Sequence, residues 1–206
     1  MHRRNQTWLI GGVGLIGCAV AGMLQSAMAA TPGASAVKIV ADLCWGAAIV
    51  VFAIGLSPAE SVVARKPFGV TAMVVLALWP ISTTLLWMLL DPGQSPGAGW
   101  IVLGYLSILV PVAAALVAAV QIARAGTVPN RWRWAPLWVL AAQAIVWALP
   151  QAVAVGTDTS GIQAMVGLLT LLGMLGFLAG TLGLGVLALV LATTHHASSV
   201  QVYPST

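Results

Sequence analysis

Hydrophobic residues along this chain collect into six long stretches, separated by short segments rich in proline, glycine and polar residues. A helix rises about 1.5 Å per residue, so it needs about 20 apolar residues to cross a hydrocarbon layer about 30 Å thick. Each stretch meets that length. The six predicted helices cover approximately residues 8–30, 37–56, 68–90, 99–123, 134–155 and 162–192, followed by a short tail over 193–206.

Composition strengthens this interpretation, because 60% of the 206 residues are hydrophobic and only 6% are charged. A soluble domain carries roughly 25% charged residues, since its surface faces water. So few charges cannot cover an apolar core, and the solvent of this chain must be partly hydrocarbon. The sequence therefore predicts an all-α integral membrane protein, a single transmembrane domain built as a six-helix bundle.

The basic residues predict its orientation, because cytoplasmic loops of membrane proteins carry an excess of Lys and Arg. Only Lys38 lies on the side of the membrane opposite to the other seven. Those seven are Arg3, Arg4, Arg65, Lys66, Arg124, Arg131 and Arg133. Both termini are therefore predicted to be cytoplasmic. The excess of Arg over Lys and the abundance of Ala, Gly and Val favour a bacterial plasma (inner) membrane.

The first predicted helix has a second interpretation. Arg3 and Arg4, the apolar run and Ala27-Met28-Ala29 resemble a secretory signal peptide, and residues 15–18 resemble a lipoprotein cleavage site. Cleavage would leave five helices with unchanged orientation. A signal peptide has an apolar region of about 7–15 residues, whereas this run is long enough to span a membrane. The length favours a retained helix.

Two cytoplasmic segments carry local signals. Residues 57–60 read Ser-Pro-Ala-Glu, a capping box with proline at the first helical position, which predicts a short helix over residues 61–66 near the headgroups. Further along, the chain reads Arg131-Trp132-Arg133-Trp134. Trp prefers the membrane interface and Arg pairs with anionic lipid phosphates, so this segment is predicted to anchor the fifth helix. The alternative is a docking site for a lipid or a partner protein.

Polar residues inside a membrane cost free energy unless they are paired, so they are the first candidates for function. Asp42 lies near the outer end of the second predicted helix, and Lys38 lies one turn before it. Together they form either a boundary ion pair or part of a site for a proton or cation. Other polar residues are predicted in the same outer half: Gln25, Thr83, Thr84, Tyr105, Gln143 and Gln151. All eight form a candidate polar vestibule, or otherwise hydrogen bonds between helices.

Three prolines interrupt the third, fourth and fifth predicted helices. Each lacks an amide proton and so frees the carbonyl four residues before it. The proline and carbonyl pairs are Pro80 with Leu76, Pro111 with Ser107, and Pro150 with Val146. Broken helices can mark transporter binding sites, although proline is also common in membrane helices generally.

The sixth predicted helix carries a stripe of small residues on one face: Gly173, Gly176, Gly180 and Gly183. Such a groove lets another helix approach closely. The partner helix belongs either to the same bundle or to another subunit. A lesser version of the same pattern lies in the first helix at positions 14, 18 and 22.

No motif in the chain predicts catalysis. The sequence contains no Gly-x-Ser-x-Gly, His-Glu-x-x-His or phosphate-binding Gly-Lys-[Ser/Thr], and its three His residues lie near the termini. No enzyme activity, cofactor, metal site or nucleic-acid partner is predicted. Two function classes remain. One is a small-molecule transporter or permeation unit with an outward-facing polar vestibule. The other is a non-catalytic structural or assembly subunit, as a homo-oligomer or in a larger membrane complex.

Overall fold

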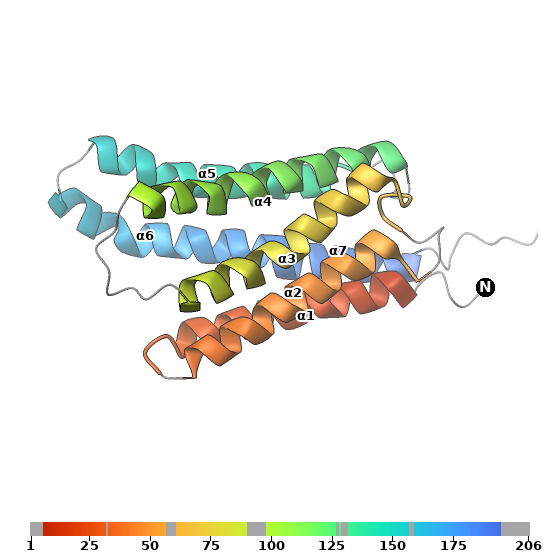
Figure 1. The fold of residues 1–206 in the computed structure, drawn as a ribbon, viewed down its shortest axis with the longest axis horizontal. Helices are drawn as coiled ribbons and strands as arrows, with labels where there is room; N and C mark the ends of the chain where they lie inside the picture. The colour runs from red at the N-terminus through yellow and green to blue at the C-terminus, as the bar shows by residue number, and fades with distance from the viewer. Residues whose placement is uncertain are drawn as a thin grey trace, which may run out of the picture.

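The computed structural model describes residues 6–31, 33–56, 61–89, 98–126, 128, 132–156 and 159–194. For residues 98–101, 150, 151, 153–156, 159–165 and 194 it describes the backbone alone. The described residues form helices and connecting turns, without strands (Figure 1). The elements are α1 (Gln6–Ala27), α2 (Ala34–Ile54), α3 (Pro67–Leu89), α4 (Ala98–Ala125), α5 (Ala135–Gly156), α6 (Thr159–Leu178), the π-helix η1 (Ala179–Gly183) and α7 (Leu184–Thr194).

Five helical runs are long and apolar enough to cross a membrane. They are α1, α2, α3, α4 and the last run, in which α6, η1 and α7 follow one another without a break. In helix α5 the segment Ala135–Leu149, where the side chains are described, is apolar but shorter than these runs. The all-helical prediction is confirmed, and this is the pattern of a multi-pass membrane protein. The count of six crossings stays a prediction.

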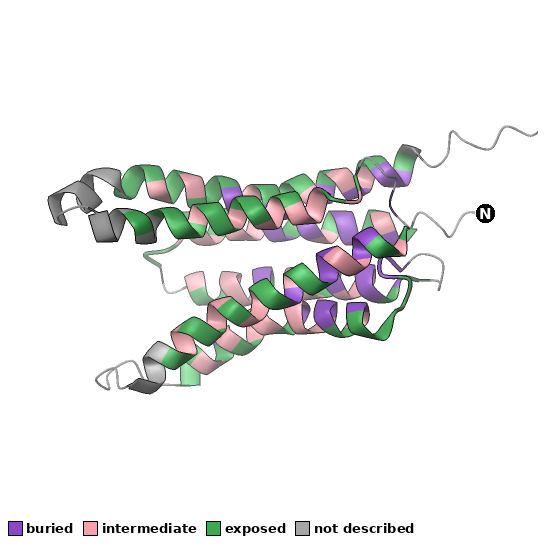
Figure 2. Ribbon diagram, turned by 90° about the horizontal axis from the view of Figure 1, so that it is seen from above, coloured by how far each residue is buried: buried purple, intermediate pink, exposed green. Residues whose placement is uncertain are grey.

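The outer surface of the bundle is apolar. Large hydrophobic side chains are widely exposed, among them Phe68 at 77%, Trp138 at 75% and Leu89 at 82%. In Figure 2 exposed residues extend along the whole length of the helices, whereas buried residues gather toward one end. Since water would penalise such a surface, the exposed side chains are those that a lipid environment accommodates.

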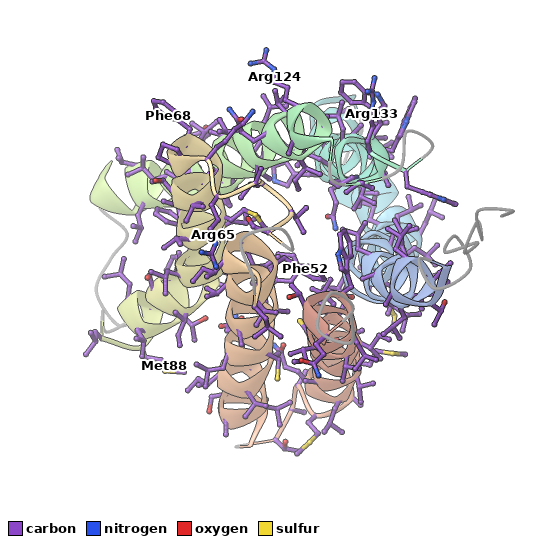
Figure 3. The ribbon with its side chains drawn as sticks, turned by 90° about the vertical axis from the view of Figure 1, so that its right-hand side faces the viewer. Phe52, Arg65, Phe68, Met88, Arg124 and Arg133 are labelled. Carbon is purple, nitrogen blue, oxygen red and sulfur yellow. The ribbon has the colours of Figure 1, made fainter. Side chains whose placement is uncertain are left out.

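The helices form a closed ring. Helices that follow one another in the chain pack side by side, and α7 packs against α1 (Figure 3). Among these neighbouring pairs, the contact between α4 and α5 is the least extensive. The buried core cluster draws on α1, α2, α3, α4 and α7 and on the connection after α2.

The ring closes where two glycines meet. A Cβ atom added to Gly12 of α1 would lie 2.9 Å from the carbonyl oxygen of Gly185 in α7, and one added to Gly185 would lie 3.0 Å from that of Gly12. Because glycine has only a hydrogen atom as its side chain, the two backbones can approach each other directly, as they do at small residues between membrane helices. The sequence pattern did not single out either glycine.

The predicted glycine groove has a different environment. Gly176 and Gly180 lie against the side chain of Gln143 from α5. A Cβ on Gly173 would meet no neighbouring atom within 4 Å, and one on Gly183 would meet only Leu178 of the same helical run. The assignment of all four glycines to one packing groove stays a prediction.

The predicted short helix over residues 61–66 is wrong. The segment is a turn in which Ala64 and Arg65 both have φ of 50°, in the left-handed region that L-residues avoid. The capping box at residues 57–60 lies outside the described residues. Ser61, Val62 and Val63 are buried in the bundle, whereas residues 64–66 are exposed, so the position of the segment near the headgroups stays a prediction.

The physical reason for the turn is the end of α2. The last carbonyls of a helix have no donor within the helix. The turn supplies donors in order: Val62 N donates to Phe52 O (3.1 Å), Ser61 Oγ to Ala53 O (2.6 Å) and Arg65 Nε to Ile54 O (2.9 Å). The turn thus directs one backbone amide and two side chains back to the carbonyls at the end of α2.

We expect Gly12→Ala to lower the thermal stability of the protein in detergent. The added methyl group collides with the Gly185 backbone, which cannot rotate away, at a cost of about 1–3 kcal/mol. The matched control is Gly17→Ala in the same helix, where a Cβ meets no atom within 4 Å. Thermal unfolding of both variants tests the crossing, and equal melting temperatures would contradict it.

Candidate functional site

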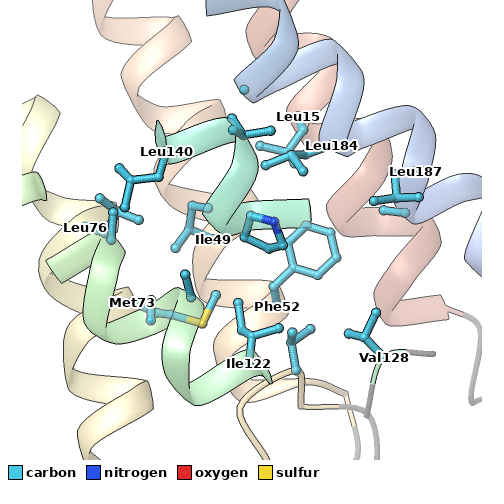
Figure 4. A pocket seen from close by; sticks show the side chains of 18 of the residues that line it. Leu15, Ile49, Phe52, Met73, Leu76, Ile122, Val128, Leu140, Leu184 and Leu187 are labelled. Atoms are coloured by element: carbon cyan, nitrogen blue, oxygen red, sulfur yellow. The ribbon is translucent and has the colours of Figure 1, made fainter. Parts of the chain in front are cut away.

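The ring surrounds a partly open cavity of about 240 Å³ (Figure 4). It lies in the half of the bundle where α2 ends and α3 begins, and among the described residues every helix except α6 contributes to its lining. Aromatic side chains form part of its wall: Trp8, Trp45, Phe52 and Trp132. The rings of Trp8 and Phe52 meet edge to face, with centroids 5.7 Å apart.

The wall is almost entirely apolar. Among the described residues that line the cavity, Gln143 has the only side-chain oxygen. Apolar cavities stay dry and take up apolar molecules, and one of about 150 Å³ admits benzene. By the same measure, 240 Å³ accommodates an apolar molecule of about ten non-hydrogen atoms.

The free space has a recognisable origin in helix α4. That helix contributes Ala115, Ala118 and Ala119 to the wall, so its side of the cavity carries little side-chain volume. A run of alanines in an apolar helix was the available sequence signal. Hydropathy gives no sign of it, because an alanine beside a cavity is as apolar as one in a packed core.

Short connections close the cavity at one end. Val62, from the turn after α2, and Val128, from the connection between α4 and α5, both line it and are both buried. The backbone of Val62 is tied to α2 by its bond to Phe52 O. The turn that caps α2 therefore also forms part of the cavity floor.

Two of the carbonyls freed by proline receive indole donors from the preceding helix. Trp45 Nε1 donates to Leu76 O (3.4 Å), which Pro80 leaves without its helical donor. Trp79 Nε1 donates in the same way to Ser107 O (3.3 Å), four residues before the proline in α4. The side chain of Pro150 lies outside the described residues.

A third link of this kind joins α5 to the last helical run. Gln143 Nε2 donates to Gly176 O (2.7 Å), and Thr181 Oγ1 donates to Phe177 O (2.8 Å). Both carbonyls lie just before η1, where bonding shifts from i→i+4 to i→i+5. Side chains supply donors where the regular ladder changes.

Asp42 is buried between α2 and α3 with its charge compensated. Lys38 Nζ donates to both carboxylate oxygens, at 2.9 and 3.1 Å, and Thr84 Oγ1 donates to Oδ2 at 2.7 Å. Asp42 as a whole residue is 9% exposed. The structure thus brings together three of the eight residues predicted for the vestibule.

The other predicted vestibule residues do not join this group. Thr83 donates to carbonyls of its own helix, and Tyr105 is 62% exposed on α4. Gln25 is half-buried in α1, and the side chain of Gln151 lies outside the described residues. Gln143 lines the cavity instead. The vestibule stays a prediction, and of its eight residues only Gln143 lines the cavity inside the ring.

The predicted lipid interface is described in part, since Arg131 lies outside the described residues. The guanidinium of Arg133 lies 5.4 Å from the ring centroid of Trp134, within range of a cation–π contact. Its Nε atom is buried and has no hydrogen-bond partner among the described residues. Trp132 is 44% exposed and also lines the cavity, so it does more than mark the membrane surface.

Comparisons of the chain with protein-family models, with curated proteins and with solved structures give no match. Within the described part of the chain, no three His, Cys, Asp or Glu side chains gather as metal ligands would. The class of the protein is set by the fold and the site together: a multi-pass helical membrane protein with an apolar cavity inside its helix ring.

We expect Thr84→Val to destabilise the protein by about 1–2 kcal/mol, because the Asp42 carboxylate loses a buried donor. Thr83→Val is the matched control, since its hydroxyl bonds only to the backbone of its own helix. Unfolding of both variants in the same detergent measures the difference. If the two variants have the same free energy of unfolding, the hydrogen bond from Thr84 to Asp42 contributes nothing to stability.

Proposed function

We propose that this protein is a non-enzymatic small-molecule transporter or permeation unit whose substrate is apolar and binds in the ring cavity. The observation that carries the proposal is the cavity itself, a partly open apolar space inside a ring of apolar helices, five of whose runs are long enough to cross a membrane. Sites between helices are the usual place for small-molecule binding in helical bundles. An apolar wall does not compensate an ion or a sugar for lost hydration, but it suits a molecule that already dissolves in lipid.

Irregular helices beside the cavity support movement as well as binding. Transporter sites are typically formed by discontinuous helices, which can rearrange without losing a full ladder of hydrogen bonds. Leu76, whose carbonyl is freed by Pro80, and Gly180 of η1 both line the cavity. Helices α4 and α5 form the least extensive contact of the ring, and we propose the seam between them as the entry from the bilayer.

We propose six crossings with both termini in the cytoplasm of a bacterial inner membrane. The support is the position of the basic residues: Arg65 and Lys66 follow α2, Arg124 lies in the last turn of α4 and Arg133 precedes α5 (Figure 3). Alternating helices bring these connections to one end of the bundle. Anionic lipid at that surface would compensate the positive charge.

Cysteine labelling tests this orientation. In a variant without Cys18 and Cys44, we expect Lys66→Cys to be labelled by a membrane-impermeant maleimide in inverted vesicles but not in intact cells. Thr31→Cys, at the opposite end, should show the reverse. Labelling of Lys66→Cys from outside intact cells would refute the proposed topology.

The second candidate is a non-catalytic assembly subunit, and one observation favours it. Gly173 in α6 is exposed, and a Cβ added there would meet no neighbouring atom within 4 Å. An exposed small residue in a membrane helix suits the close approach of a further helix, from a second copy or a larger complex. Cross-linking in native membranes with mass spectrometry distinguishes the two: stoichiometric recovery of one larger partner favours the subunit.

We expect Ala115→Phe to block binding by filling the cavity. The probe is 1-azidonaphthalene, which is photoactivated in detergent, and labelled cavity peptides are quantified by mass spectrometry. Labelling should fall at least about fivefold, because a phenyl group occupies much of the available volume. Ala113→Phe is the matched control, since Ala113 is exposed on the same helix and does not line the cavity. Equal labelling of the wild type and both variants would overturn the proposed function.

A further inference from the structure

We propose that the ligand of this cavity carries one hydrogen-bond donor, a hydroxyl or N–H group, on an apolar body of about ten non-hydrogen atoms, and that Gln143 binds that donor. This inference rests on the proposed function and deepens it, because it names the class of molecule and the residue that selects it. The observation behind it is a single oriented amide in an otherwise apolar wall.

The orientation of that amide follows from chemistry. The partner of Gln143 in the last helical run is a carbonyl oxygen, Gly176 O, at 2.7 Å. A carbonyl only accepts hydrogen bonds, so the amide must turn its NH₂ group toward it. The other end of the amide is therefore Oε1, which lies 3.6 Å from the position that a Cβ of Gly176 would take and receives no hydrogen bond recorded for the described residues.

The amide is also held firmly in place. Gly180 packs against it so closely that a Cβ there would lie 3.2 Å from Gln143 Nε2, and Gly180 itself lines the cavity. The carbonyl that accepts from Nε2 belongs to α6, three residues before η1 begins. An oxygen fixed in this way is a preorganised acceptor, which lowers the cost of recognising a donor.

Selection by this oxygen follows from the apolar surroundings. A hydroxyl that enters an apolar cavity loses its hydrogen bonds to water, and the loss is large unless the wall provides an acceptor. Gln143 has the only side-chain oxygen among the described lining residues. Trp45 Nε1, a donor in the same wall, is already bonded to Leu76 O. A ligand with a donor near Gln143 is therefore accepted, and removal of the oxygen should penalise that ligand selectively.

Competition against photolabelling by 1-azidonaphthalene tests the inference with two ligands of nearly equal size, 2-naphthol and 2-fluoronaphthalene. Only 2-naphthol has a donor. In Gln143→Met we expect the affinity for 2-naphthol to fall by about five- to tenfold and that for 2-fluoronaphthalene to change by less than about twofold. Gln121→Met is the matched control, since Gln121 is half-buried in α4 and does not line the cavity. It should leave both affinities unchanged.

Each outcome decides one of the two proposals. If Gln143→Met lowers both affinities by the same factor, or neither, Gln143 only supports the helices and the inference is overturned. If Gln143→Met does not fold, the wild type alone decides: after correction for partition into detergent, 2-naphthol must compete at least about fivefold better than 2-fluoronaphthalene, and equal competition overturns the inference. If wild-type cavity peptides are not labelled at all, the proposed function fails with it.

Discussion

A backbone carbonyl in hydrocarbon must have a hydrogen-bond donor, and this requirement shapes the helix ring. The regular ladder is interrupted in α3, in α4 and at η1. At each interruption the preceding helix reaches across with a side-chain donor: Trp45 to α3, Trp79 to α4 and Gln143 to the last run. These bonds fix how neighbouring helices are rotated and shifted against each other, because a donor reaches its carbonyl in only one register. The places where the helical hydrogen bonding is interrupted are thus also the places where neighbouring helices are hydrogen-bonded to each other.

The same requirement acts at the end of α2, with a different solution. Its last carbonyls accept from the turn over residues 61–66, and the turn holds Ala64 and Arg65 in the left-handed region. Each such residue costs on the order of 1–3 kcal/mol. Three hydrogen bonds and the burial of Val62 and Val63 offset this cost. The first half of this connection is buried, so that it both caps a helix and forms part of the cavity floor.

Local sequence patterns were enough to predict those features that depend only on residues close together in the chain. The apolar stretches predicted the helices, the prolines predicted which carbonyls would be freed, and the four-residue spacing predicted the pair of Lys38 and Asp42. The closure of the ring depends on Gly12 and Gly185, which lie far apart in the sequence. A glycine shows that a close approach is possible but not where it occurs. The cavity escaped prediction for a similar reason: it is a space left between alanines and aromatic rings that only the assembled ring brings together.

The position of Gln143 joins structure and function in one side chain. Its NH₂ group completes the link from α5 to the last helical run, while the oxygen of the same amide belongs to a residue of the cavity wall. A donor that binds this oxygen polarises the amide and strengthens the bond on its other side, because hydrogen bonds in series reinforce one another. Occupancy of the proposed site would therefore tighten α5 against the last run. The contact between α5 and α4 is also the least extensive of those between neighbouring helices in the ring. A ligand that draws α5 toward the last run would act directly on the seam between α4 and α5, through which we propose that the ligand enters. Helix α5 would therefore take part both in binding the ligand and in admitting it.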